Sequence, residues 1–174
     1  LRRTTILHGS ADIETEDMIA DEEMVITISR HGYIKRLPIR TYRNQGRGGK
    51  GLSGSNLKDE DFIENIFVAS THAYILFFTD HGICHWLKVH RIPSLGRLAR
   101  GKAIVNLLQL EKDEKIEAFV TVRDFNDPYY VTMVTKNGTI KKSDLKSFSR
   151  PRVNGIIAIK LLDDDKLIEA KITE

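Results

Sequence analysis

The sequence holds one cysteine, Cys84, in 174 residues. A single thiol cannot form an internal disulfide, so the sequence favours a reducing, cytoplasmic setting. It has no run of 18 apolar residues and no signal-peptide pattern at Leu1-Arg2-Arg3-Thr4, so we expect no membrane partner. No helical periodicity of any length is present. With 41% hydrophobic and 29% charged residues, the sequence predicts one folded domain built from strands.

Net charge is also small, at +3, but the charges are unevenly spread. Between Arg30 and Lys50 the chain carries seven cations and no Asp or Glu. A dense, one-sided basic segment suits a polyanion, and its commonest form is a nucleic-acid backbone. Residues 1–23 instead turn from basic to acidic. We expect them to be a lead-in that docks onto the domain or connects it to an upstream part, with a solvated linker as the alternative.

The basic segment contains the stretch Gln45-Gly46-Arg47-Gly48-Gly49-Lys50-Gly51. Its four glycines allow positive φ and close backbone approach, and its two cations add mobile charge. Gly46-x-Gly48-x-x-Gly51 matches a dinucleotide fingerprint, but no apolar strand precedes it and no helical period follows. A phosphate-binding P-loop also fails, because Gly51 follows Lys50 where Ser or Thr is needed. A flexible, solvated loop remains the alternative to polyanion binding.

A hairpin pattern occurs three times along the chain. Runs of β-branched and aromatic residues at 25–28, 74–78 and 130–134 each lead through a short turn to a second run at 33–37, 83–87 and 139–142. The turns are His31-Gly32, His81-Gly82 and Asn137-Gly138, at intervals of 50 and 56 residues. Asn-Gly is a strong signal for a type I′ turn, which needs positive φ at both central residues, and His tolerates positive φ better than most residues. We therefore predict three hairpins with turns of this type.

The same features follow each hairpin. These are a basic arm ending in glycine (Arg47 to Gly51, Arg97 to Gly101, Arg150 to Gly155), an apolar strand (52–57, 103–110, 156–162), an acidic turn (59–61, 111–114, 163–165) and an Ile-Glu pair. Four short strands per unit of roughly 50 residues predict propeller-like blades, at approximately 24–70, 71–122 and 123–174. Radial repetition would bring the basic arms to one level and gather the acidic turns elsewhere.

At this point the sequence resembles the C-terminal domain family of the DNA gyrase A subunit, over essentially its whole length. The stretch 45–51 matches the gyrase A box, which is degenerate or absent in the paralogue topoisomerase IV. Arg2-Arg3-Thr4 resembles the end of the N-terminal breakage-reunion part, and residues 20–36 resemble the opening blade. The resemblance implies a β-pinwheel, an all-β disc of strand-swapped blades. Family members usually have six blades and three repeats are visible, so either a fragment or a short domain is expected.

The resemblance also implies a function. Such a domain wraps DNA around a basic rim without catalysing a reaction, which enables the ATP-dependent negative supercoiling of the complete enzyme. Implied partners are duplex DNA of any sequence, the N-terminal part of the gyrase A subunit, and the gyrase B subunit, in the bacterial cytoplasm at the nucleoid. No cofactor is implied for this domain, since ATP and Mg²⁺ act elsewhere in the enzyme. The alternatives are the equivalent domain of topoisomerase IV and a propeller that binds an acidic protein.

The expected DNA-binding residues are the cations of the three units. They are Arg30, Lys35, Arg36, Arg40, Arg43, Arg47 and Lys50 in the first unit, Lys88, Arg91, Arg97, Arg100 and Lys102 in the second, and Lys141, Lys142, Lys146, Arg150 and Arg152 in the third.

Other residues that suggest chemistry have simpler explanations. The family's catalytic tyrosine lies in the N-terminal part, so no tyrosine here is assigned that role. His81, His85 and His90 lack the ligand spacing of a zinc site, and we predict no metal site. The run 163–165 could hold Mg²⁺, but it matches the other acidic turns and is expected to be solvated. Cys84 and Trp86 lie in a predicted strand and should pack in the core.

Overall fold

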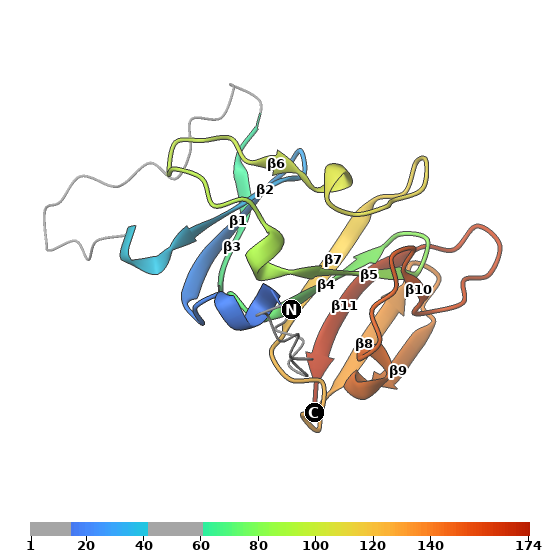
Figure 1. The fold of residues 1–174 in the computed structure, drawn as a ribbon. Helices are drawn as coiled ribbons and strands as arrows, with labels where there is room; N and C mark the ends of the chain where they lie inside the picture. Colours follow the sequence, from blue (N-terminus) through green and yellow to red (C-terminus); the bar gives the residue numbers. More distant parts are fainter. Residues whose placement is uncertain (1–14, 42–60) are drawn as a thin grey trace, which may run out of the picture.

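A computed structural model describes residues 15–41 and 61–174 of this chain (Figure 1). Its regular elements there are strands and short 3-10 helices. The strands are β1 (Glu23–Ser29), β2 (Tyr33–Pro38), β3 (Ile63–Ser70), β4 (Tyr74–Thr79), β5 (Ile83–Lys88), β6 (Lys102–Ala103), β7 (Ile116–Val122), β8 (Tyr130–Thr135), β9 (Ile140–Asp144), β10 (Ile156–Ile157) and β11 (Leu167–Thr173). The helices are η1 (Thr15–Met18), η2 (Ile39–Thr41), η3 (Val89–Arg91), η4 (Ile104–Asn106) and η5 (Leu145–Phe148).

The strands form three antiparallel sheets, which confirms the predicted all-β architecture. The first sheet has the order β3-β1-β2-β6, the second β10-β5-β4-β7 and the third β11-β8-β9. Each is built on one predicted hairpin: β1 with β2, β4 with β5, and β8 with β9. In Figure 1 the three sheets follow one another from the blue part of the chain to the red part.

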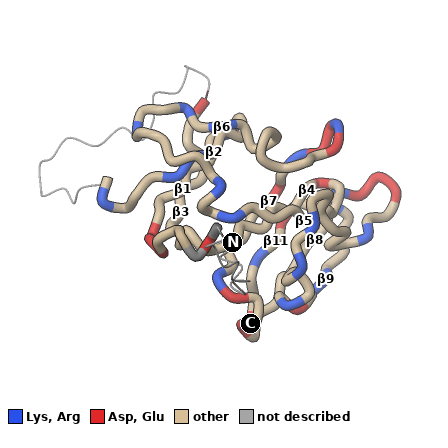
Figure 2. Tube along the Cα trace, in the orientation of Figure 1, with Lys and Arg blue, Asp and Glu red and all other residues tan. Residues whose placement is uncertain are grey.

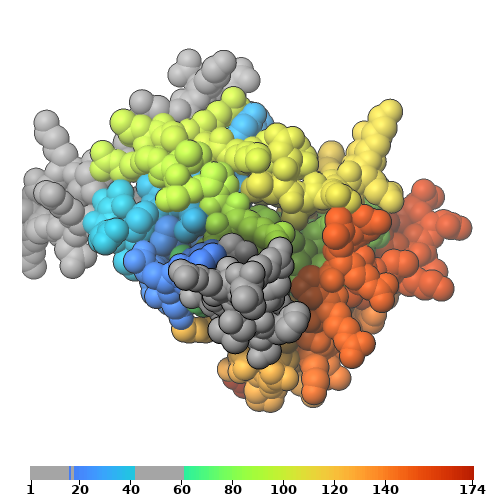
Figure 3. Space-filling view, in the orientation of Figure 1, coloured from blue at the N-terminus to red at the C-terminus, as the bar shows by residue number. Residues whose placement is uncertain are grey.

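The fourth strand of the first two sheets comes from the repeat that follows. β6, from the second repeat, pairs with β2, and β10, from the third repeat, pairs with β5. In Figure 3 the yellow-green residues of the second repeat lie directly against the cyan residues of the first. The third sheet has three strands among the described residues, so four-stranded blades are found for two of the three units.

Two predictions of strand length are wrong. The apolar stretch 103–110 contributes only the end of β6 and then turns into η4, while 156–162 contributes only β10. In the third repeat the ladder ends because Ala158 and Ile159 both donate their N–H groups to the carbonyl of Gly82, at 2.9 and 3.2 Å. The remaining apolar side chains fill the space between sheets instead: Leu108 and Ile159 are buried.

The hairpin turns are also not type I′. Each turn is closed by a hydrogen bond from the glycine N–H to a carbonyl three residues earlier: Gly32 to Ser29, Gly82 to Thr79 and Gly138 to Thr135. The glycines have φ of 74°, 75° and 87°, while His31, His81 and Asn137 do not have positive φ. This is the longer hairpin connection in which a type I turn is followed by a glycine bulge, so only one residue per turn must be glycine.

The core consists of two apolar clusters, each lying between neighbouring sheets. One joins Ile26, Ile28 and Ile34 of the first sheet to Ile75 and Phe77 of the second. The other joins the opposite face of the second sheet to the third, through residues that include Leu76, Phe78, Val120, Val131 and Met133. β4 alternates between the two clusters, so both faces of the second sheet are buried, and the residues from Ile75 to Phe78 are all apolar.

Candidate nucleic-acid interface

The sheet order separates basic and acidic segments of the chain. β3, β7 and β11 form one edge of their sheets, and the arms that carry β6 and β10 run along the opposite edge of the first two. The chain contains no Asp or Glu from residue 81 to 110 or from 145 to 162, and these two ranges include the arms of the second and third repeats. Figure 2 shows the acidic turns at 111–114 and 163–165 as red loops at the right of the molecule, away from the blue segments around β2 and β6.

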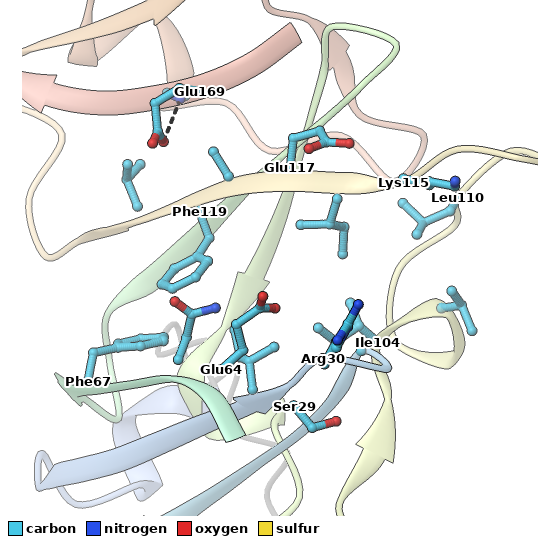
Figure 4. A pocket seen from close by; sticks show the side chains of 18 of the residues that line it. Ser29, Arg30, Glu64, Phe67, Ile104, Leu110, Lys115, Glu117, Phe119 and Glu169 are labelled. Atoms are coloured by element: carbon cyan, nitrogen blue, oxygen red, sulfur yellow. Dashed lines mark hydrogen bonds between the residues drawn. The ribbon is translucent and has the colours of Figure 1, made fainter. Parts of the chain in front are cut away.

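A cavity of about 930 Å³ is lined in part by residues of β3, β7 and β11 (Figure 4). Glu64, Glu117 and Glu169, one from each of β3, β7 and β11, contribute to its lining together with Arg30, Lys115 and Lys171. Burial and the neighbouring Asp80 carboxylate raise the pKa of Glu117 above its usual range. Carboxylates from all three sheets offset the cations of the lining, so this cavity is a poor site for a polyanion.

The arm of the second repeat presents exposed cations. Arg91, Arg100 and Lys102 are exposed, and Arg97 is half-buried. The guanidinium of Arg100 lies over the ring of Tyr33, 3.8 Å from its centroid, which restrains the side chain without neutralising it. These residues lie on the edge of the first sheet, because the arm crosses onto β2.

The arm of the third repeat presents Lys146, Arg150 and Arg152, all exposed. Lys141 and Lys142, in β9, are exposed but engaged with the chain itself. The Nζ of Lys141 donates to the carbonyl of Ala158 at 2.7 Å. The Nζ of Lys142 donates to Glu174 at 2.6 Å and lies 4.2 Å from the ring centroid of Tyr130. Bonds to neutral carbonyls leave the positive charge of both lysines available.

In the first repeat the structure describes Arg30 and Arg40, both exposed. The Arg30 guanidinium lies 5.6 Å from the ring centroid of Phe62. Arg43, Arg47, Lys50 and the whole stretch 45–51 lie outside the described residues, so their expected role stays a prediction.

Three of the expected DNA-binding cations are used inside the protein. Lys35 is 1% exposed, and its ammonium donates to the carbonyls of Arg97 and Ala99 at 2.5 and 2.7 Å, so its expected surface contact with DNA is not supported. Arg36 is half-buried and donates to the carbonyls of Ile92 and His90. Lys88 is half-buried and pairs with Glu16 at 2.6 Å. Period-2 alternation would place Lys35 on one face of a strand but cannot show that a later segment covers that face.

The expectation that 163–165 is a solvated acidic turn is wrong for one residue. Asp163 and Asp164 are exposed, but Asp165 is buried and accepts hydrogen bonds from the N–H groups of Asn137 and Lys166. Asp61 does the same for the first hairpin, accepting from His31. Burial alone would raise the pKa of both carboxyls, but hydrogen bonds from the hydroxyls of Ser29 and Thr135, then these N–H bonds and the neighbouring positive charges, hold it below the usual range. The acids therefore fix hairpin turns.

The second repeat departs from this arrangement. Glu114 takes the place of Asp61 and Asp165 and lies against His85, with 3.5 Å between Oε1 and Nε2. Asp80 lies two residues before its hairpin glycine, as Arg30 and Lys136 do in the other repeats. The three backbone N–H groups donate to matching carbonyls: Asp80 to Lys115, Arg30 to Phe62 and Lys136 to Lys166. The buried carboxylate of Asp80 accepts from the Lys115 N–H at 2.9 Å and from the Lys166 ammonium at 2.8 Å. Asp80 thus ties the second sheet to the third.

The remaining candidates lie where packing was expected. Cys84 is fully buried, and burial raises the pKa of its thiol far above the usual range. Trp86 packs against the second core cluster and donates its Nε1–H to the carbonyl of Phe148 at 2.8 Å. Within residues 15–41 and 61–174, no group of three or more His, Cys, Asp or Glu side chains could hold a metal ion. None of the helices in those ranges is long and apolar enough to cross a membrane.

The described part of the lead-in docks onto the start of the second repeat. Asp21 hydrogen-bonds to Ser70 and pairs with Arg123 at 2.8 Å, and the N–H of Glu22 donates to the hydroxyl of Thr71 at 3.1 Å. With the Glu16–Lys88 pair, these contacts hold residues 16–22 against the domain.

Comparison with known proteins gives a consistent picture at the level of sequence. The family model described as "DNA gyrase C-terminal domain, beta-propeller" matches residues 23–70, 73–123 and 129–174. Over 98% of its length, the chain is 50% identical to the DNA gyrase A subunit of Fibrobacter succinogenes. Over 99% of its length, it is 48% identical to the same protein of Salmonella typhimurium. The chain spans about a fifth of the length of these curated relatives.

Among solved structures, a C-terminal domain of DNA topoisomerase IV matches with a TM-score of 0.75, covering 90% of this chain and 47% of that one. A DNA gyrase A C-terminal domain matches with a TM-score of 0.66, covering 87% and 48%. Both are 29% identical to this chain. The two families share one fold, so the difference in TM-score carries less weight than the higher identity to the gyrase sequences.

Proposed function

This chain belongs to the DNA gyrase C-terminal domain family, and from that premise we propose that it binds duplex DNA along the arm edges of its sheets and bends it. The supporting observation is the separation of charge. Acid-free arms carry exposed cations on one edge, and β3, β7 and β11 carry Glu64, Glu117 and Glu169 on the other. DNA that follows successive arms must curve, because the two described arms lie on different sheets.

The proposed contacts are to phosphate. Most of the described cations are exposed, and phosphate contacts position a duplex without reading its sequence. The cations that we propose are Arg30, Arg40, Arg91, Arg97, Arg100, Lys102, Lys141, Lys142, Lys146, Arg150 and Arg152, together with Arg43, Arg47 and Lys50 outside the described residues. Lys35 is not among them.

In the complete enzyme, this bending would serve negative supercoiling. The gyrase A relatives continue well beyond this chain, so the N-terminal part of the A subunit and the gyrase B subunit are proposed partners, with ATP and Mg²⁺ acting outside this domain. Such a role places the protein with the bacterial chromosome in the cytoplasm.

The test is duplex affinity as a function of salt. If Z phosphates are neutralised, the logarithm of the binding constant should fall against the logarithm of salt concentration with a slope of about −0.9Z. Duplexes of unrelated sequence should bind alike. A slope near zero, with binding to an acidic protein instead, would favour the protein-scaffold alternative.

The structural likeness to topoisomerase IV keeps that paralogue as a second candidate. The stretch 45–51 discriminates between them. In the reconstituted enzyme, Arg47→Ala with Lys50→Ala should abolish negative supercoiling and leave relaxation. Undiminished supercoiling would show that 45–51 is a passive loop, and a wild-type enzyme that only relaxes DNA would favour topoisomerase IV.

A further inference from the structure

The arm of the second repeat repeats the pattern of residues 45–51. Counted back from Gly101, the heptad Leu95-Gly96-Arg97-Leu98-Ala99-Arg100-Gly101 has glycine at its second and seventh positions, arginine at its third and a cation at its sixth. The same types stand at those positions in 45–51. The heptad differs by having Leu98 and Ala99 at its fourth and fifth positions in place of two glycines. Unlike 45–51, the heptad lies within the described residues.

Strand β2 of the preceding sheet holds the heptad at both ends. At its start, the N–H of Leu95 donates to the carbonyl of Arg36 at 3.3 Å. At its end, Gly101 has φ of 104°, and a Cβ built there would lie 2.9 Å from the carbonyl oxygen of Ile34. Only glycine allows this approach. Between the ends, Arg100 lies over Tyr33.

The centre of the heptad is hydrogen-bonded to the side chain of Lys35. The Lys35 ammonium donates to the carbonyl of Arg97 at 2.5 Å and to that of Ala99 at 2.7 Å, so it joins the backbone on both sides of Leu98. Leu98 itself points outward, with 48% of its surface exposed. The ammonium therefore draws two carbonyls inward in a segment whose third and sixth side chains are the arginines. Charge-assisted hydrogen bonds of this kind are among the stronger ones in proteins.

We infer that Lys35 is a positioning residue: its buried ammonium fixes the shape of the heptad 95–101 on β2, so that Arg97 and Arg100 face a phosphate backbone together. This inference rests on the proposed DNA-binding function. It reassigns a cation that the sequence places among the DNA contacts. Lys35 acts on DNA through the backbone of another repeat and touches no phosphate.

Among the three equivalent residues, only Lys35 is a buried lysine that bonds to two carbonyls of an arm. His85 and Lys141 occupy the place of Lys35, three residues after the hairpin glycine. His85 lies against Glu114, and a Cβ on Gly155 of the arm would lie 3.0 Å from its ring. Lys141 is exposed on β9 and bonds to Ala158. Lys141 is thus a matched control, a lysine of the same strand position whose charge faces solvent.

The test is a double-mutant cycle on the full chain, with affinity measured on a labelled duplex of arbitrary sequence. Lys35→Met should weaken binding by roughly three- to thirtyfold, within the range of coupled residues in one network. In the Arg97→Ala, Arg100→Ala background, Lys35→Met should have almost no further effect, because the cations that it positions are gone. Lys141→Met should instead weaken binding by the same factor in both backgrounds.

Each outcome decides the inference. Equal loss from Lys35→Met in both backgrounds would show an independent contact and overturn it, and unchanged affinity in the wild-type background would show that Lys35 is only structural. If Lys35→Met does not fold, the cycle is run with Lys35→Gln, whose amide can still donate to one carbonyl. Lys35→Arg, which keeps charge and donors, should restore part of the affinity. Failure of the wild-type chain to bind DNA would reject the proposed function itself.

Discussion

Strands β2 and β9 have the same place in their sheets and opposite surroundings. β2 is covered on its outer edge by the arm of the next repeat, whereas β9 has no strand on that edge among the described residues. The consequence is visible at one position: Ile34 in β2 is 0% exposed and Ile140 in β9 is 69% exposed. β5 resembles β2, because Cys84 occupies the equivalent position in β5 and is also 0% exposed. A unit of this fold therefore completes its core only when another repeat supplies an arm.

The largest expected effect comes from deleting the covered side chain. Ile34→Ala should destabilise the chain by about 2–5 kcal/mol, because it leaves a cavity under the arm of the second repeat. Ile140→Ala, at the uncovered position, should change stability by no more than about 0.5 kcal/mol. Chemical denaturation of both variants measures the difference. Equal effects would mean that Ile34 is not held by the arm.

A second comparison tests the crossing point of the arm. Gly101→Ala should cost about 3 kcal/mol, because a side chain at positive φ is strained and its Cβ would meet the carbonyl of Ile34. Gly138 has φ of 87° but open space around it, so Gly138→Ala should cost only about 1 kcal/mol. Thermal unfolding of the two variants provides the measurement. A smaller loss for Gly101→Ala would indicate that the arm can lift away without penalty.

A third prediction concerns pH at the joint between the second and third sheets. Burial would raise the pKa of Asp80, but hydrogen bonds from Lys166 and Lys115 and the nearby charge of His81 hold it below the usual range. A lowered folded pKa gives stability that is present above the unfolded value of about 3.9 and is lost as pH falls through the folded value. Asp80→Asn should remove about 1–2 kcal/mol at neutral pH and flatten the acid dependence. Denaturation between neutral pH and pH 2 tests this, and an unchanged acid limb would contradict it.

The smallest effect is expected at the lysine of the uncovered strand. Lys141→Met should alter the free energy of unfolding by no more than about 0.5 kcal/mol, since the side chain is exposed. Lys35→Met should cost about 1–3 kcal/mol, because the carbonyls of the half-buried Arg97 and Ala99 lose this donor. Comparable losses in urea titrations would remove the distinction between the covered and uncovered strands.

The hairpins and the repeat could be predicted because their signals are local. Glycine at intervals of 50 and 56 residues, with β-branched runs on both sides, predicts the pairing of β1 with β2, β4 with β5 and β8 with β9. The turn type could not, because Gly32 serves either as the second turn residue or as the bulge that follows. The exchange of β6 and β10 between sheets was implied by the family resemblance and not by any residue pattern.

At the candidate interface, the sequence correctly identifies segments rich in cations but not the direction of each side chain. Lys35 and Lys141 are both lysines three residues after a hairpin glycine, and only the arm that lies over β2 separates their roles. Asp165 looks like its exposed neighbours Asp163 and Asp164, yet it is buried beneath a hairpin turn. Such assignments depend on contacts between residues far apart in the chain.

The lone thiol offers a way to time the opening of an arm. Cys84 pairs with Ile156 of β10, and a Cβ on Gly155 would lie 2.9 Å from its carbonyl oxygen. Because burial keeps the thiol protonated and out of reach, an alkylating reagent can label it only in molecules whose third-repeat arm has left β5. The labelling rate then reports how often the third-repeat arm leaves β5, without an engineered probe. DNA bound across the arms should lower the labelling rate of Cys84.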